Sequence, residues 1–204
     1  MTDTGPTVRD HLQLLGKFLR HPRTVGAVAP SSAALARRMV DGIGAAGERI
    51  VELGPGTGSF TRAIVERLSP GARLLAIEID PAFADGIRRR WPAIDCVCAS
   101  AEDLPAIGAA HDFLPVDRII SGLPFASLPE AITRGILDGV ERTLAPGGTF
   151  TTFQYVHAYG LPPAVAFRQE LTRRLGGAPA STLVMLNVPP AWVLTWRRPP
   201  ASRG

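Results

Sequence analysis

Three glycines at alternate positions mark the segment VELGPGTGSF, residues 51–60. Glycine lets a backbone turn tightly and approach a ligand, because no Cβ atom intervenes. A helix that starts directly afterwards offers backbone N–H groups to a bound polar group. A dinucleotide fingerprint would need a third glycine at Ser59, so the pattern here is acidic-x-G-x-G-x-G instead. This spacing predicts a nucleotide-type binding loop between a strand and a helix.

An acidic residue follows the glycine segment at an informative distance. Glu78 lies twenty residues after Gly58, within AIEID at positions 76–80 and at the expected end of a strand. A carboxylate at this place can accept hydrogen bonds from both ribose hydroxyls of a nucleotide. The alternative is an ordinary solvated acid at a strand end. Asp80 precedes a proline and is predicted to cap the next helix.

The elements that position these residues alternate along the chain. Short β-branched runs alternate with helical patterns, which predicts an α/β fold with a mostly parallel sheet and helices on both faces. Strands are expected at 49–53, 73–79, 94–98, 117–121, 148–155, 182–188 and 191–197, and helices at 31–43, 58–69, 81–90, 128–144 and 163–175. Only Pro189 and Pro190 separate the last two strands, so we expect an antiparallel hairpin.

Composition narrows the class of protein. A chain of 204 residues with 46% hydrophobic residues suggests one folded domain and excludes a disordered chain. No run reaches the ~18 apolar residues of a membrane-spanning helix. The N-terminus lacks the features of a secretory signal, so a cytoplasmic location is expected. Two cysteines make neither a disulfide framework nor a zinc site, so no metal is expected. The net charge of +4 favours an anionic partner.

Residues 7–20, TVRDHLQLLGKFLR, have the pattern of an amphipathic helix. At ~100° per residue the apolar side chains fall within one arc of about 160°. Arg9, Gln13, Lys17 and Arg20 cluster on the opposite side. Such a helix either packs its apolar stripe on the core or lies in a membrane surface, where its basic side chains attract anionic lipid. The pattern alone leaves both possibilities open.

Taken together, four segments resemble the motifs of class I S-adenosylmethionine-dependent methyltransferases: ELGPGTG, AIEID, ASAEDL at 99–104 and SGLPF at 121–125. The resemblance covers residues 48–198 and implies a Rossmann-like, seven-stranded sheet with an antiparallel last strand. It implies S-adenosylmethionine as the cofactor. It also implies that the glycine loop passes the methionine moiety, Glu52 supports the loop and the amino end, and Glu78 holds the ribose. The implied cofactor-binding residues are Glu52, Gly54, Gly56, Gly58, Glu78, Ile79, Ser100, Ala101 and Glu102, with Ser100 where the family often has an acid.

Two branches of this class compete. GLPF at 122–125 resembles the Asn-Leu-Pro-Tyr motif of ribosomal RNA adenine dimethyltransferases, but Ser121 and Gly122 replace the region of the Asn. Those enzymes also carry an RNA-binding domain, whereas this sequence ends after the expected hairpin. Residues 18–32, FLRHPRTVGAVAPSS, resemble bacterial phospholipid N-methyltransferases instead. That resemblance implies a membrane-binding helix and substrate-covering segment at 1–30, a methyltransferase domain at 31–198 and a tail at 199–204.

We therefore predict a phospholipid N-methyltransferase. It would transfer methyl groups from S-adenosylmethionine to phosphatidylethanolamine and its methylated derivatives, towards phosphatidylcholine. Its expected partners are an anionic membrane surface and this lipid, without nucleic acid, and its expected location is the inner face of the cell membrane. An RNA adenine N6-methyltransferase is the alternative enzyme, and a non-catalytic lipid-binding module is the alternative from another class.

Residues acting on the substrate are expected after the fourth and fifth strands, where open α/β sheets place ligands. The amine must lie in line with the activated methyl group, and its ammonium form must first lose a proton. The catalytic candidates are Ser121, the Gly122 carbonyl, Tyr155 and His157. Aromatic rings of Phe125 and Tyr155 would contact a methylated ammonium, and guanidinium groups of Arg23 and Arg168 would pair with phosphate. For each aromatic, histidine or arginine candidate, a role in the core or on the surface is the alternative.

Overall fold

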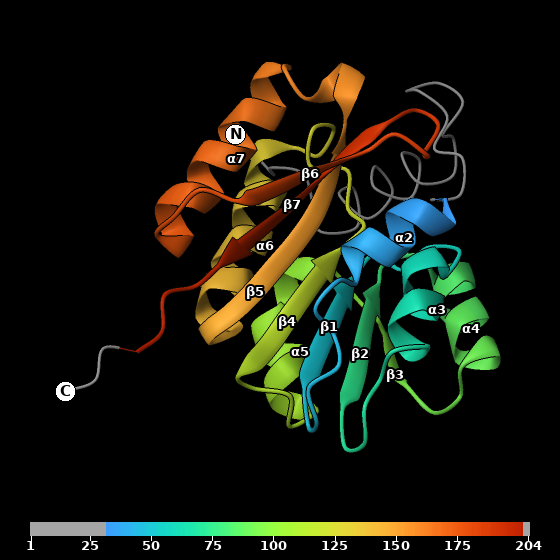
Figure 1. The fold of residues 1–204 in the computed structure, drawn as a ribbon. Coiled ribbons are helices and arrows are strands. Elements are labelled where there is room, and N and C mark those ends of the chain that lie inside the picture. Colours follow the sequence, from blue (N-terminus) through green and yellow to red (C-terminus); the bar gives the residue numbers. More distant parts are fainter. Residues whose placement is uncertain (1–31, 202–204) are drawn as a thin grey trace, which may run out of the picture.

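A computed structural model describes residues 32–201 of the chain (Figure 1). One sheet contains β1 (Arg49–Leu53), β2 (Arg73–Glu78), β3 (Asp95–Cys98), β4 (Val116–Ser121), β5 (Leu144–Tyr155), β6 (Ala180–Val184) and β7 (Ala191–Arg197). The α-helices are α2 (Ala33–Met39), α3 (Ser59–Val65), α4 (Pro81–Arg90), α5 (Leu104–Ala110), α6 (Glu130–Thr143) and α7 (Pro162–Leu175). Single 3-10 turns lie at Ala101–Asp103 (η1) and Val156–Ala158 (η2). The helix predicted over 7–20 and the candidate Arg23 lie outside the described residues.

The strand order is β3-β2-β1-β4-β5-β7-β6. Strands β1 to β5 pair in parallel, and β7 is antiparallel to both of its neighbours, β5 and β6. The predicted mostly parallel sheet with an antiparallel last strand is therefore confirmed. The order reverses between β1 and β4, and in such sheets ligands bind beyond the carboxyl ends of the strands at the point of reversal.

The final hairpin differs from the prediction in its connection. Strand β6 ends at Val184, four residues before the predicted end, so residues 185–190 form the connection. The physical reason is Asn187, whose side chain is buried. Its Oδ1 accepts a hydrogen bond from the Ser32 N–H, and its Nδ2 donates one to the Pro189 carbonyl. These bonds turn the chain away from the strand ladder before the two prolines.

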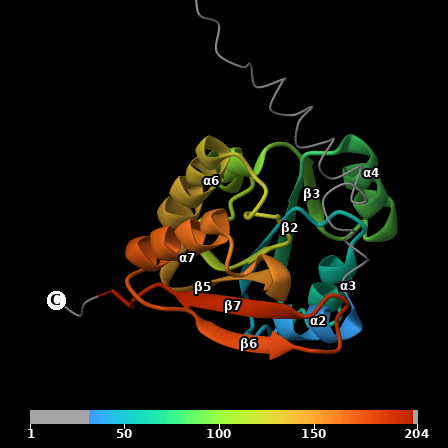
Figure 2. The same ribbon diagram turned by 90° about the horizontal axis from the view of Figure 1, so that it is seen from above.

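Helices lie on both faces of the sheet, as Figure 2 shows from above, and an apolar cluster fills each interface. Helices α5, α6 and α7 pack on one face, in a core that includes Phe113, Phe150 and Trp196. Helices α2 and α3 pack on the other face, around Leu35, Phe60 and neighbouring strand residues. Helices on both faces were predicted and are confirmed. No helix within residues 32–201 is long and apolar enough to span a membrane.

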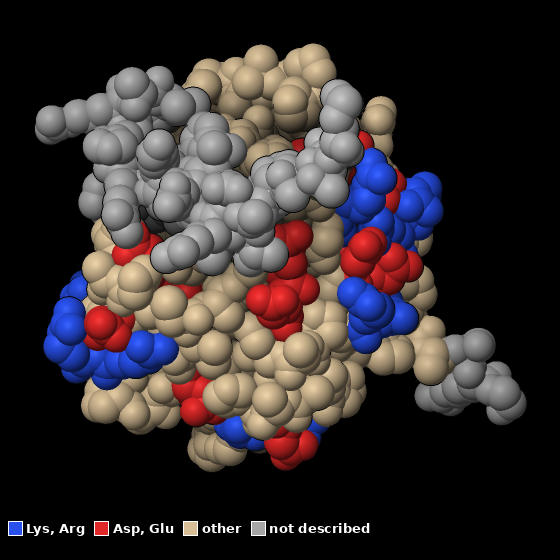
Figure 3. All heavy atoms as spheres, turned by 180° about the vertical axis from the view of Figure 1, so that it is seen from behind, with Lys and Arg blue, Asp and Glu red and all other residues tan. Residues whose placement is uncertain are grey.

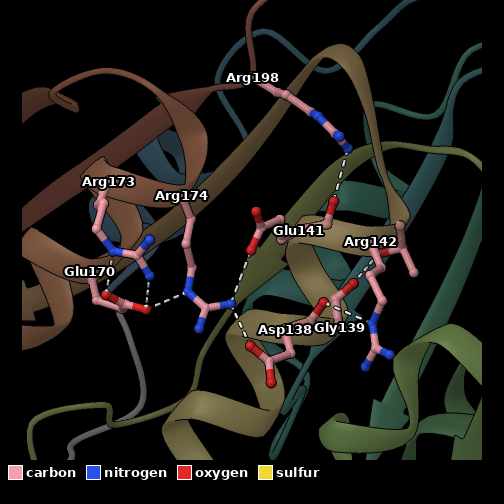
Figure 4. Close-up of polar contacts among 9 residues, drawn as sticks. Asp138, Gly139, Glu141, Arg142, Glu170, Arg173, Arg174 and Arg198 are labelled. Atoms are coloured by element: carbon pink, nitrogen blue, oxygen red, sulfur yellow. Dashed lines mark hydrogen bonds and ion pairs between the residues drawn. The ribbon is translucent and has the colours of Figure 1, made fainter.

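An ionic cluster joins α6 to α7 (Figure 4). The Arg174 guanidinium lies between the carboxylates of Asp138 and Glu141 on α6 and that of Glu170 on its own helix. Glu170 also pairs with Arg173, at 2.7 Å. The side chain of Arg174 is only 8% exposed, so the cluster contains one well-buried cation held by three partly exposed acids. It thereby holds in place the helix that packs against Phe125.

Candidate active site

The glycine loop follows β1 and precedes α3, as predicted. Gly54, Gly56 and Gly58 have positive φ angles of 70°, 53° and 85°, in the region that residues with a Cβ atom rarely adopt. The Gly54 N–H donates to the Ile77 carbonyl, and the Gly58 N–H donates to the Pro55 carbonyl. The loop is therefore a tight turn fixed to the end of β2, and its shape depends on glycine.

The end of β4 touches this loop. Leu53 pairs with Ser121, and the Gly122 N–H donates to the Leu53 carbonyl at 2.8 Å. A Cβ atom added to Gly122 would lie 2.8 Å from the Gly54 carbonyl oxygen. Glycine at position 122 is therefore needed for the close approach of two backbones. The SGLPF segment and the glycine loop are therefore in direct backbone contact at the point where the strand order reverses.

Glu52 is fully buried beneath the loop. One of its oxygens accepts a hydrogen bond from the Thr61 hydroxyl at 2.7 Å, and the other, Oε1, has no partner among the described residues. Burial raises the pKa of the Glu52 carboxyl to about 8, against a smaller lowering by Thr61. A buried acceptor without a partner is costly. An ammonium group of a ligand would satisfy it and favour the ionised carboxylate.

Glu78 is buried at the end of β2. Its two oxygens accept hydrogen bonds from the backbone N–H groups of Gly56 and Asp80, each at 2.9 Å. Burial raises the pKa of the Glu78 carboxyl, and these backbone donors partly oppose the effect. The residue predicted to hold a ribose therefore also fastens the glycine loop. Asp80 caps α4, as predicted, by accepting from the Ala82 and Phe83 N–H groups.

The remaining cofactor candidates lie beside Glu78. Ala99, after β3, donates its N–H to the Glu78 carbonyl, which brings the next residues against β2. Ser100 caps the η1 turn, accepting from the Glu102 N–H and contacting the Glu102 carboxylate at 3.2 Å. Ala101 is buried, and Ile79 packs against the core. Thus the predicted cofactor-binding residues gather along the carboxyl ends of β1, β2 and β3.

Tyr155 and His157 lie together at the end of β5. The strand ends at Tyr155, and His157 belongs to the η2 turn, yet their rings stack with centroids 5.6 Å apart and planes 11° apart. Tyr155 also contacts Phe153 edge to face. Burial raises the pKa of the Tyr155 hydroxyl, which therefore remains a hydrogen-bond donor. Ser121 is buried at the end of β4, where its hydroxyl accepts from the Leu123 N–H.

Two substrate candidates lie elsewhere: Phe125 packs against α7, and Arg168 belongs to that helix. Phe125 is buried and stacks on Phe167 at 4.3 Å. Arg168 donates to the Gln154 side chain and to the Tyr159 carbonyl, and its guanidinium lies 3.7 Å from the centre of the Tyr159 ring. Tyr155 packs instead with the core on the other face of the sheet. The structure thus brings Tyr155 and His157 together, and places Phe125 and Arg168 in a separate group.

Three residues near the loop were not predicted. Thr61 binds Glu52, and Leu123 and Trp91 lie where side chains at positions 54 and 58 would have to fit. Thr61 had a signal, because it is a polar residue among the apolar residues Phe60, Ala63 and Ile64 on the buried face of α3. The two contacts with glycines depend on tertiary packing and have no local signal.

The donors and acceptors present fit S-adenosylmethionine. Glu52 would offer its amino group a buried oxygen that has no partner within residues 32–201. Glu78 would offer its ribose the remaining carboxylate lone pairs, and the glycine loop would leave room along the backbone. Within residues 32–201, no group of three or more His, Cys, Asp or Glu side chains is placed to hold a metal ion.

Comparisons with known proteins show which family the chain is similar to. Residues 50–148 match the family described as "Methyltransferase domain". The chain is 37% identical over 147 residues to an ornithine lipid N-methyltransferase of Singulisphaera acidiphila, covering 70% of this chain and 77% of that protein. It is also 37% identical over 81 residues to ribosomal RNA small subunit methyltransferase A of Thiobacillus denitrificans, which covers 39% of this chain and 29% of that protein.

Solved structures share the fold. An O-methyltransferase from Bacillus cereus in complex with SAH superposes with a TM-score of 0.62 at 14% identity, covering 96% of this chain and 93% of that one. The O-methyltransferase TomG from Streptomyces achromogenes in complex with SAM gives a TM-score of 0.62 at 18% identity, covering 92% and 89%. The fold and the site therefore define a Rossmann-like methyltransferase. The chain belongs to the S-adenosylmethionine-dependent methyltransferases, and S-adenosylmethionine is its cofactor.

Proposed function

We propose that this protein methylates the amine of a membrane lipid, with phosphatidylethanolamine and its methylated derivatives as substrates. The observation that carries the proposal is the 37% identity to an ornithine lipid N-methyltransferase over 77% of that protein's length. Ornithine lipid and phosphatidylethanolamine share the chemistry that matters, since both present an amine on a lipid headgroup. The segment at residues 18–32 favours the phosphatidylethanolamine branch.

The pair of rings after β5 suits such a substrate. S-adenosylmethionine supplies a methyl group already activated on a sulfonium, so the chain's residues have to bind, orient and deprotonate the amine. The Tyr155 and His157 rings stack beside the carboxyl edge, where the π-face of Tyr155 turned away from His157 would attract an alkylated ammonium. His157 is exposed in the η2 turn and is our candidate for the group that accepts the amine's proton.

Membrane association is part of the proposal. The basic amphipathic pattern at 7–20 supports a helix that lies in an anionic lipid surface, at the inner face of the cell membrane. Reversing the charges in Lys17→Glu with Arg20→Glu should lower binding to anionic vesicles and leave cofactor affinity unchanged. Equal vesicle binding by the variant and the unaltered protein would contradict the role of this helix.

The decisive experiment supplies the protein with S-adenosylmethionine labelled in its methyl group and separate vesicles of phosphatidylethanolamine, ornithine lipid or phosphatidylcholine. We expect label in phosphatidylethanolamine, none in phosphatidylcholine, and mass spectrometry showing the number of methyl groups added. Label only in ornithine lipid would keep lipid N-methylation and correct the substrate. No label in any lipid would overturn the proposal. Glu78→Ala serves as the control that links the label to the cofactor site.

An RNA adenine N6-methyltransferase is the second candidate, because ribosomal RNA methyltransferases are among the relatives. Two observations favour it less. The chain spans 29% and 41% of the first two such relatives. On the face seen in Figure 3, basic side chains lie beside acidic ones over α4 and over α6 and α7. Direct competition between RNA and lipid vesicles for the labelled methyl group separates the two, since preference for RNA would decide for this candidate.

A non-catalytic lipid-binding module is tested by calorimetry. Two features support cofactor binding: the Glu52 oxygen that has no partner in the described part of the chain, and the tight glycine loop. A protein that bound vesicles but showed no heat of S-adenosylmethionine binding would be such a module.

A further inference from the structure

The connection between β6 and β7 exposes large apolar side chains. Met185 is 66% exposed, Leu186 80% and Val188 83%. On the segment between β5 and α7, Val156 in η2 is 44% exposed and Leu161 is 48% exposed. We name these five residues the apolar rim. A cluster of exposed large apolar side chains on a folded domain marks a surface that meets an apolar partner.

The loop is held in shape, so this exposure is not a matter of a loose segment. Asn187, between Leu186 and Val188, is only 3% exposed. Its side chain accepts from the Ser32 N–H at 2.9 Å and donates to the Pro189 carbonyl at 2.7 Å. A polar residue therefore points inward while its two apolar neighbours point to solvent. This arrangement is the reverse of the usual distribution of polar and apolar side chains.

The apolar rim lies at the edge of the sheet that carries the candidate active site. Val184, at the end of β6, pairs with Ala191, which in turn pairs with Tyr155. The Val156 N–H donates to the Pro190 carbonyl at 2.9 Å, which ties η2 to the loop. Figure 1 shows the β6–β7 connection and the segment between β5 and α7 at the same end of the sheet.

The charges around the apolar rim match an anionic lipid surface. Residues 180–196 contain no charged residue. The nearby helix α2 presents Arg37 and Arg38 in its last turn, both exposed. Arg38 pairs with Asp41 at 2.7 Å and donates to the Thr182 hydroxyl on β6 at 2.6 Å, so the two arginines and this acid leave a net positive charge. Thr182 is two residues from the end of β6, about 7 Å at 3.3 Å per residue. The apolar side chains at the tip would therefore reach the acyl chains of a bilayer. The arginines, about 7 Å behind the tip, would lie at the level of the phosphate headgroups.

We propose that the apolar rim inserts into the membrane and, with Arg37 and Arg38 at the headgroups, turns the carboxyl edge of the sheet towards the lipid. This inference rests on the proposed function, because a lipid substrate is what makes a bilayer the expected occupant. It adds a second, folded contact to the helix predicted over 7–20. Lipid headgroups would then reach Tyr155 and His157 directly from the surface.

The test measures vesicle binding by the full chain in the absence of cofactor, on vesicles of equal parts phosphatidylglycerol and phosphatidylethanolamine. Leu186→Asp should lower partitioning onto vesicles roughly tenfold or more, since a leucine that the bilayer would bury is exchanged for a charge. Ala178→Asp is the matched control, because it adds the same charge to an exposed position at the other end of β6. Equal partitioning by the two variants would overturn the inference.

A second pair of variants reports insertion without loss of the apolar surface. Leu186→Trp and Ala178→Trp share Trp91, Trp192 and Trp196, so the difference between them isolates the added ring. We expect vesicles with brominated acyl chains to quench Leu186→Trp more strongly. A blue-shifted emission from Leu186→Trp without vesicles would overturn the inference. A shift that depends on protein concentration would indicate that a second copy of the chain covers the tryptophan. A shift that does not depend on concentration would indicate that residues of the same chain cover it.

The lipid methylation assay keeps the two proposals distinguishable. If the protein methylates lipid but its Leu186→Asp and Ala178→Asp variants bind vesicles equally, the inference is wrong and the proposed function stands. Loss of vesicle binding in Leu186→Asp, in a protein that methylates no lipid, would support the rim as a membrane contact and remove the proposed function.

Discussion

The backbone N–H of Gly56 donates a hydrogen bond to Oε2 of Glu78 across 2.9 Å. The other carboxylate oxygen accepts from the Asp80 N–H. Glu78 therefore connects the glycine loop after β1 to the end of β2, in addition to the ribose contact that the family resemblance implies. We therefore expect both the shape of the loop and the affinity for the cofactor to depend on this carboxylate.

Glu78→Ala should weaken S-adenosylmethionine binding at least about tenfold, because hydrogen bonds to a charged group contribute about 1.5–3 kcal/mol each. The affinity of Glu78→Gln for the cofactor should lie between those of Glu78→Ala and the unaltered protein, since its amide keeps one acceptor oxygen. Isothermal calorimetry measures the affinities, and vesicle binding serves as the control for folding. An affinity equal to that of the unaltered protein in Glu78→Ala would contradict the ribose role.

Gly122→Ala should disturb, by steric contact, the backbone contact between the SGLPF segment and the glycine loop. Its Cβ atom would lie 2.8 Å from the Gly54 carbonyl oxygen, so the ends of β1 and β4 would have to separate. We expect a loss of about 1–3 kcal/mol in the free energy of unfolding and weaker cofactor binding. Gly86→Ala is the control, because a Cβ atom there meets nothing within 4 Å. If thermal unfolding and calorimetry gave Gly122→Ala the same values as Gly86→Ala, the close approach would be unimportant.

Glu52 should make the cofactor-free protein less stable as pH rises. Its folded-state pKa is about 8, above the ordinary 4.5, so the folded state keeps a proton that the unfolded state has already lost. Between these two values the free energy of unfolding should fall by roughly 1.4 kcal/mol per pH unit from this group. Above about 8 both states are ionised and the contribution levels off.

Glu52→Gln removes that titration. Urea unfolding at several pH values should therefore show the variant gaining stability relative to the unaltered protein as pH rises from 5 to 8. The comparison cancels the contribution of the other titrating groups. A difference in free energy that stays constant over this range would contradict the buried, protonated state of Glu52.

Arg174→Met should loosen the packing of α7 on α6. The substitution removes three ion pairs to Asp138, Glu141 and Glu170, and we expect a loss of about 1–2 kcal/mol, since each acid is partly exposed. Arg173→Met is the matched control, because its side chain is 69% exposed and a smaller loss is expected. Equal unfolding temperatures for the two variants would contradict the importance of the buried cation.

The same cluster should respond to acid. Hydrogen bonds from Arg173 and Arg174 lower the pKa of Glu170 from 4.5 to about 2. A lowered folded-state pKa stabilises the protein above 4.5, and the contribution is lost as pH falls from there towards 2. Arg174→Met should therefore lose less stability than the unaltered protein over this acid range, as measured by unfolding in urea. An identical acid dependence would contradict the link between the two residues.

Helices and strands could be predicted from the sequence where the local pattern and the tertiary packing favour the same structure. The bounds of β1, α4 and β7 match their predictions because each has clear local limits, such as the Asp80 cap and Pro81 at the start of α4. Helix α5 was not predicted, since LPAIGAA is short, has a proline in its first turn and contains glycine. Its position depends on close contact with α6, where Gly139 faces Pro105.

The site was predictable where chemistry imposes sequence spacing, and not where packing decides. The glycine loop and Glu78 follow such a spacing, and the structure joins them. The placement of Phe125 against Phe167 depends on α7, which is far along the chain. The run at 182–188 resembled a strand because Leu186 and Val188 are apolar, and only the structure shows that they face solvent.

The position of β7 between β5 and β6 has a consequence for biosynthesis. Strand β6 is synthesised first, but within residues 32–201 its only strand partner is β7. A growing chain must therefore keep an uncharged, unpaired strand until β7 emerges and inserts beside β5. Unpaired strand edges without charges invite association with other chains. Any event that delays or removes β7 costs the sheet two strands at once and prolongs the interval in which nascent chains are prone to aggregate.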